Sequence, residues 1–111
     1  MNLFEMNTDF TTLSMNPITG IKLKTALNEI PNWKRYNDEE ASKLTRTFYF
    51  ADFKTAFLFA AEVGAIAEDQ NHHPILLISW GEVVVNWWSH NLKNLHLNDF
   101  IMAAKTDRLI D

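Results

Sequence analysis

Two apolar segments joined by a very short link constrain the fold of this chain most strongly. They are residues 75–80 and the valine-rich residues 83–89, and only Gly81-Glu82 lies between them. A two-residue link that contains glycine is typical of a tight turn between antiparallel strands. The sequence therefore predicts a β-hairpin in which Pro74, before the first strand, lies roughly opposite Ser89, at the end of the second.

The other regular elements follow from apolar spacing, β-branched and aromatic content, and turn residues. We expect a short helix over 21–30, strands over 33–36 and 43–50, a long helix over 52–69 and a last helix over 97–110. The order is β-β-α-β-β-α after a leading helix. Hairpins that alternate with helices predict an α+β fold, in which a four-stranded antiparallel sheet has its helices packed on one face.

The long helix over 52–69 is the clearest element outside the hairpin. Asp52 can cap its first turn. Its apolar stripe is expected to comprise Phe53, Phe57, Ala60, Ala61, Gly64 and Ala67, widened by Leu58, Val63 and Ile66. The small residues at 60, 61 and 64 would permit close approach to a sheet or to another helix.

A chain of 111 residues is long enough for one ordinary domain, which we assign to residues 17–111. Residues 1–16 are rich in Asn, Thr, Ser and Met without a clear period, and we expect a mobile N-terminal extension. Met6 or Met15 could each be an alternative start.

Composition excludes several classes of protein. The net charge of −4 and the isoelectric point near 5.5 argue against a nucleic-acid-binding surface, which needs clustered Lys and Arg. The absence of cysteine excludes disulfides and thiol nucleophiles. No apolar run approaches the roughly 18 residues of a membrane helix, and the N-terminus does not resemble a secretory signal. A cytoplasmic protein without a membrane contact is therefore expected.

All four histidines, at positions 72, 73, 90 and 96, lie near the predicted hairpin. Histidine is the side chain whose unperturbed pKa lies near neutrality, so a group of histidines suits proton transfer. Pro74 favours an extended backbone at His73, and adjacent extended residues point in roughly opposite directions. We therefore expect different roles for His72 and His73, with the hairpin pairing placing both beside His90.

The spacing of residues in this region is similar to that of a known family. Seven positions in register over residues 68–99 carry the resemblance: Glu68, His72, His73, Pro74, Trp80, His90 and Asp99. A lone His-His-Pro occurs by chance, whereas this longer pattern resembles the pterin-4a-carbinolamine dehydratases. In layout the resemblance extends over residues 21–109.

The resemblance implies dehydration of 4a-hydroxytetrahydropterin to quinonoid dihydropterin, the recycling step after aromatic amino acid hydroxylation. It implies a pterin substrate, no cofactor, a homodimer or homotetramer, and work alongside an aromatic amino acid hydroxylase. Carried over residue by residue, the resemblance implies that His72 and His90 are the acid–base pair. It implies that His73, Pro74 and Ser89 bind the substrate and that Glu68 and Asp99 are supporting carboxylates. It implies no metal ligand.

Each of these residues also has a simpler interpretation. Glu68 could be a solvated carboxylate at a helix end, and Asp99 could cap the last helix through its position in the first turn. We expect His96 to be a loop or capping residue. The four tryptophans are expected in the core or at an interface, although Trp80 or Trp88 could flank a flat ring.

Two other functions remain open on the sequence. His72, His90 and a carboxylate could form a two-His-one-carboxylate metal site, although no short metal-binding spacing is present. The chain could also be a non-catalytic dimerisation or accessory module of the same fold, since some relatives bind a transcription factor. Three histidines in register argue against a purely structural role.

Overall fold

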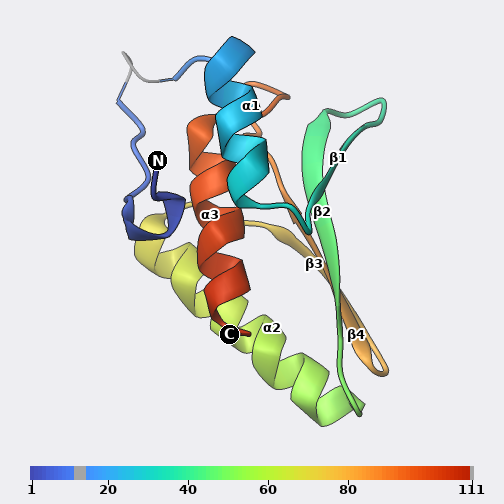
Figure 1. Ribbon diagram of the computed structural model, residues 1–111. Coiled ribbons are helices and arrows are strands. Elements are labelled where there is room, and N and C mark those ends of the chain that lie inside the picture. Colours follow the sequence, from blue (N-terminus) through green and yellow to red (C-terminus); the bar gives the residue numbers. More distant parts are fainter. Residues whose placement is uncertain (12–14, 111) are drawn as a thin grey trace.

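Among the residues that the structure describes, 1–11 and 15–110, three α-helices lie on one face of a four-stranded antiparallel sheet (Figure 1). In this computed structural model the elements follow in the order η1 (Leu3–Glu5), α1 (Gly20–Glu29), β1 (Lys34–Asn37), β2 (Ser42–Tyr49), α2 (Phe53–Gln70), β3 (Ile75–Ser79), β4 (Glu82–Trp87) and α3 (Leu97–Arg108). The expected α+β class and the β-β-α-β-β-α order after a leading helix are confirmed.

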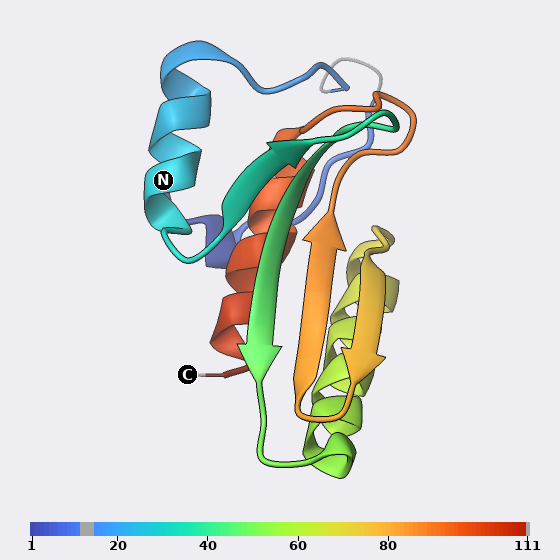
Figure 2. The same ribbon diagram turned by 90° about the vertical axis from the view of Figure 1, so that its right-hand side faces the viewer.

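The sheet has the strand order β1-β2-β4-β3 (Figure 2). β4 therefore lies inside the sheet, between β2 and its hairpin partner β3, and all pairs are antiparallel. Its inward side chains Val83, Val85 and Trp87 alternate along the strand and are fully buried. This central position holds the end of β4 firmly, which matters because Ser89 and His90 follow it.

The hairpin turn differs from the prediction. Ser79 pairs with Glu82, so the turn is Trp80-Gly81 and not Gly81-Glu82. Gly81 has φ +77°, and a Cβ there would lie 3.2 Å from the Phe50 carbonyl oxygen, which explains the glycine. The predicted alignment of Pro74 with Ser89 is wrong by two positions, because Ile75 pairs with Asn86. A shift of two keeps every side chain on its face.

α2 begins where the sequence predicted, with Asp52 as its N-cap. The Asp52 carboxylate accepts a hydrogen bond from the Thr55 amide at 2.8 Å, and this contact lowers the pKa of Asp52. The helix ends at Gln70, and the C-cap residue Asn71 adopts the left-handed conformation with φ 51°. Neither this 18-residue helix nor another helix of the described residues is long and apolar enough to cross a membrane.

The predicted apolar stripe of α2 is partly wrong. The residues that face the sheet and α3 are Ala56, Phe59, Ala60, Val63 and Ala67. Phe53, Phe57 and Leu58 are instead about half exposed, at 48%, 48% and 56%. A Cβ on Gly64 would meet nothing within 4 Å, so its small size serves no close contact within this chain. The helix is apolar on both sides, and periodicity alone could not decide which side faces the core.

The described N-terminal residues pack against the helices. Leu3 is fully buried, and its amide donates a hydrogen bond to Glu29 Oε1 at 3.1 Å. Lys105 Nζ donates to the Phe4 carbonyl at 2.9 Å, and the Arg108 guanidinium lies 4.1 Å from the centre of the Phe4 ring. The mobility expected for residues 1–16 stays a prediction, but η1 is placed against α3 (Figure 1).

We expect Leu3→Ala to lower the free energy of unfolding by about 2 kcal/mol, because it removes a fully buried side chain from the core. Ile21→Ala is the matched control, since Ile21 is 85% exposed and its truncation should change stability by less than about 0.5 kcal/mol. Urea unfolding followed by circular dichroism measures both. Equal midpoints for Leu3→Ala and the parent chain would show that η1 contributes no packing energy.

Candidate active site

Three of the four histidines face one pocket of about 190 Å³. The loop after α2 brings His72 and His73, and the segment after β4 brings His90. The lining residues are Phe10, Met15, Asn71, His72, His73, Ser89, His90 and Asn91. The expectation that His72 and His73 lie beside His90 is confirmed, since the two-position shift in the hairpin leaves the strand ends adjacent.

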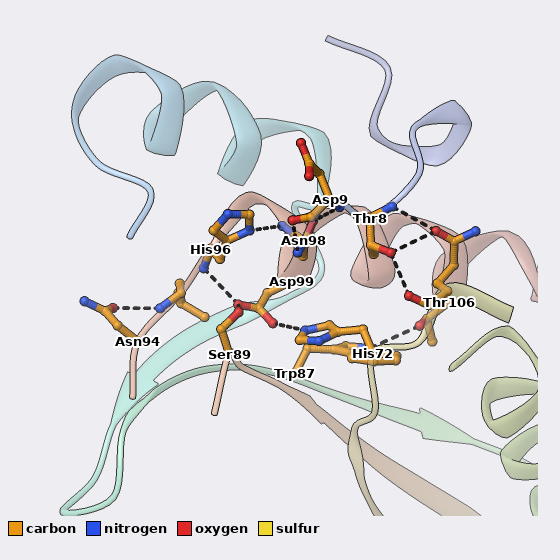
Figure 3. A network of polar contacts seen from close by, with 12 residues as sticks. Thr8, Asp9, His72, Trp87, Ser89, Asn94, His96, Asn98, Asp99 and Thr106 are labelled. Atoms are coloured by element: carbon orange, nitrogen blue, oxygen red, sulfur yellow. Dashed lines mark hydrogen bonds and ion pairs between the residues drawn. The ribbon is translucent and has the colours of Figure 1, made fainter. Parts of the chain in front are cut away.

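His72 is buried and bonded to a carboxylate. Its Nε2 lies 2.6 Å from Asp99 Oδ1, and its exposed fraction is 8% (Figure 3). The imidazole stacks on the Trp87 ring with centroids 5.7 Å apart and planes 19° from parallel. Because an ionised carboxylate only accepts, Nε2 donates this hydrogen bond and Nδ1 is left for another partner.

Asp99 has no solvent exposure and is shared among three donors. Its Oδ1 faces His72, and its Oδ2 accepts from Ser89 Oγ at 2.8 Å and from the His96 amide at 2.9 Å (Figure 3). The last contact is half of a capping box at the start of α3. Asp99 therefore has both roles that the sequence left open, as a helix cap and as a carboxylate partner of a histidine.

His96 is the N-cap residue of α3, which confirms its expected capping role. Its Nδ1 accepts a hydrogen bond from the Asn98 amide at 2.9 Å, and the side chain is 4% exposed. His96 does not line the pocket of the other histidines, and lies instead in a cavity of about 510 Å³ beside the N-terminus of α1.

His73 points outward from the same loop. Its Nε2 contacts Glu68 Oε2 from the last turns of α2, and the two side chains are 53% and 79% exposed. His72 is thus buried against Asp99 and His73 is exposed beside Glu68, although both line the same pocket. Since the His73–Glu68 pair is open to water, its electrostatic contribution to stability is small.

His90 is exposed and lies against Trp88. The two ring centroids are 4.3 Å apart, with planes 34° from parallel. The Lys43 ammonium lies over the other aromatic ring of this group, that of Trp88, at 4.2 Å from the ring centre. Hydrogen bonds to Asp38 and Glu40 raise the pKa of Lys43, which keeps this ammonium charged. His90 also borders a second cavity of about 490 Å³, which Trp88 lines as well. His90 therefore lies between this cavity and the histidine pocket.

The remaining sequence candidates have mixed positions. Pro74 is half-buried beside the pocket but does not line it. Trp33, Trp87 and Trp88 are buried, whereas Trp80 is 74% exposed at the tip of the β3–β4 hairpin, away from the histidines. In the described part of the chain, no three His, Asp or Glu side chains are grouped as metal ligands would be.

Four residues that line the pocket were not found from the sequence, namely Phe10, Met15, Asn71 and Asn91. Phe10 and Met15 come from the segment expected to be a mobile extension, which has no period that would place it on an element. The position of Phe10 depends on long-range hydrogen bonds between Thr8 and Gln70 and between Asp9 and Asn98. Such contacts leave no local signal in a sequence.

Comparisons with known proteins agree with this architecture. A family model described as pterin 4 alpha carbinolamine dehydratase matches residues 16–109. The chain is 45% identical over 94 residues to a "Putative pterin-4-alpha-carbinolamine dehydratase" of Chlorobaculum tepidum, a match that covers 85% of each chain. It is 48% identical over 82 residues to a protein of the same description from Nitrosococcus oceani, covering 74% of this chain and 73% of the relative.

A solved structure has the same fold. It is described as the crystal structure of a transcriptional coactivator/pterin dehydratase from Brucella melitensis. The TM-score is 0.76 at 30% sequence identity, and the match covers 86% of this chain and 100% of the other.

We expect Asp99→Asn to lower the free energy of unfolding by about 1–3 kcal/mol. The amide places an N–H₂ group where one of the three donors needs an acceptor. Asp99→Ala should cost more, because it leaves all three donors without this partner. The control is Glu62→Gln, at an exposed position on α2. Urea unfolding measures the series, and an Asp99→Asn midpoint equal to that of Glu62→Gln would contradict this account.

Proposed function

The chain belongs to the pterin 4 alpha carbinolamine dehydratase family, and on that premise we propose that His72 and His90 move the protons of its reaction. The activity is that of a pterin-4a-carbinolamine dehydratase, a hydro-lyase. In the dehydration the C4a–O bond breaks and the hydroxyl leaves as water after gaining a proton. N5 loses its proton, and a C4a–N5 double bond forms.

The observation that supports the proposal is one pocket lined by three imidazoles, of which His72 is bonded to a buried carboxylate. The reaction needs one proton donated and one removed, and an imidazole can do either near neutral pH. The exchange is balanced in protons and involves no change of oxidation state overall. The proposed mechanism therefore assigns every step to side chains and requires no metal or redox cofactor.

Asp99 supports His72 in two ways. The hydrogen bond to Nε2 fixes the orientation of the ring and leaves Nδ1 as the nitrogen available for proton transfer. The carboxylate also stabilises His72 whenever the ring carries the extra proton, as the acidic partner does in other histidine-based sites. Trp87, stacked on the same ring, limits its rotation.

We assign substrate binding to His73, Pro74 and Ser89. His73 is at the rim of the pocket and is oriented by Glu68. Ser89 donates its hydroxyl hydrogen to Asp99, but its oxygen keeps acceptor capacity for an N–H of the pterin. Pro74 acts indirectly, because it restricts the backbone of His73. The metabolic context that we propose is pterin recycling beside an aromatic amino acid hydroxylase.

We expect His72→Ala and His90→Ala each to lower kcat by roughly 10²–10⁴ while the fold survives, since general acid–base assistance is worth about that much. His73→Ala should mainly raise KM, because a binding residue contributes to ground state and transition state alike. The double variant should lose less than the product of the single losses. Turnover is measured with enzymatically generated carbinolamine by stopped flow.

His96→Asn is the matched control for the histidine variants. Asparagine is also a good N-cap, and the backbone N–H that binds Asp99 is retained, so turnover should stay near that of the parent chain. Parent-level turnover in folded His72→Ala and His90→Ala would remove the acid–base assignment. It would leave the accessory-module alternative standing.

We further propose a homodimer or homotetramer, supported by two exposed apolar surfaces. One is the outer side of α2 with Phe53, Phe57 and Leu58, and the other is the edge strand β3 with Ile75 and Leu77. Apolar groups of this size on a small domain are typical of protein contacts, and an unpaired strand edge can pair with a second copy.

We expect analytical ultracentrifugation to give a dimer or tetramer at micromolar concentration. Phe57→Glu should reduce the measured mass, because it places a charge in the outer apolar side of α2. Lys54→Glu, an exposed change on the same helix, should not. A parent chain that sediments only as a monomer would refute the assembly without bearing on the histidine roles.

A further inference from the structure

The N-terminal segment adds an aromatic wall to the histidine pocket. Phe10 lines it together with His72, His73 and His90, although the family match begins only at residue 16. The Phe10 ring lies 5.7 Å from the His72 imidazole, centroid to centroid, with planes 51° apart. It remains 43% exposed, so a large apolar surface faces the open side of the pocket.

Phe10 is held there by a clamp of hydrogen bonds on the two residues just before it. Thr8 donates from its amide to Gln70 Oε1 at 2.9 Å and from its hydroxyl to the Gln70 carbonyl at 2.7 Å. Asp9 donates its amide to Asn98 Oδ1, and Asn98 Nδ2 donates back to the Asp9 carbonyl, both at 2.9 Å (Figure 3).

The two anchoring residues belong to the elements that carry the His72–Asp99 pair. Gln70 is the last residue of α2, two positions before His72, and Asn98 directly precedes Asp99 at the start of α3. The clamp therefore fixes Phe10 relative to both partners of that pair.

The chemistry of the ring fits a flat heterocycle. An exposed phenyl group that forms one side of a pocket offers a face to an aromatic ligand, and such ring pairs are worth about 0.5–1.5 kcal/mol beyond the area they bury. The Phe10 and His72 rings are in direct contact and tilted by 51°, so they form adjoining walls, and a bicyclic ring stacked on Phe10 would lie beside His72. Phe10 donates and accepts no proton, so it can act only by positioning.

We propose that Phe10 is a substrate-positioning residue, which holds the pterin ring against His72. This inference rests on the proposed function, because it takes the histidine pocket as the place where the pterin binds. It extends the site to a residue outside the region that the family model matches.

The test compares Phe10→Ala, Phe10→Leu and Phe10→Tyr. Phe10→Ala should raise KM for the carbinolamine, and the Kd for the non-reacting oxidised parent pterin, by roughly 2- to 10-fold. The change in kcat should be smaller. Phe10→Tyr should restore both constants, whereas Phe10→Leu, apolar but without a ring, should not. Urea unfolding of each variant separates an effect on binding from an effect on stability.

Tyr49→Ala is the matched control, because Tyr49 is a 77% exposed aromatic residue at the far end of β2 and borders no part of the histidine pocket. Its KM and Kd should equal those of the parent chain. Unchanged constants in Phe10→Ala, or full recovery in Phe10→Leu, would overturn the positioning role. Failure of the parent chain to bind pterin, or full turnover in His72→Ala, would instead overturn the proposed function.

Discussion

The buried carboxylate of Asp99 is the interaction on which the site depends. It has no solvent exposure, and it accepts hydrogen bonds from His72, Ser89 and the His96 amide. An ionised group in a protein interior is tolerated only when its hydrogen bonds are satisfied. The donors come from the loop after α2, the segment after β4 and the start of α3. Stabilising this one charge therefore requires that three separate parts of the chain meet.

This requirement couples the fold to the chemistry. The same carboxylate caps α3 and orients His72, so a helix terminus and a candidate catalytic histidine share one residue. β4 supports the arrangement because it lies inside the sheet and its end carries Ser89 and His90. His73, on the same loop as His72, faces water and Glu68 instead. Neighbouring histidines thus have different environments, which suits a division between proton transfer and binding.

The N-terminal segment joins the same arrangement from outside the region matched by the family model. Leu3 is buried against the helices, Thr8 binds to Gln70 at the end of α2, and Asp9 binds to Asn98 at the start of α3. Because these anchors adjoin His72 and Asp99, the segment can influence substrate position without taking part in proton transfer.

Local patterns in the sequence determined the elements, and the tertiary structure decided how they meet. The short link between the β3 and β4 segments required an antiparallel hairpin, and the adjacent positions of His72 and His73 before Pro74 indicated different environments for the two rings, one buried and one exposed. Both conclusions depend only on neighbours in the chain. The strand order, the side of α2 that is buried and the turn at Trp80-Gly81 depend on packing between distant elements. Apolar periodicity gives the spacing of a buried face but not its partner, so Phe57 on the outside of α2 and Phe10 in the pocket could be placed only by the folded structure.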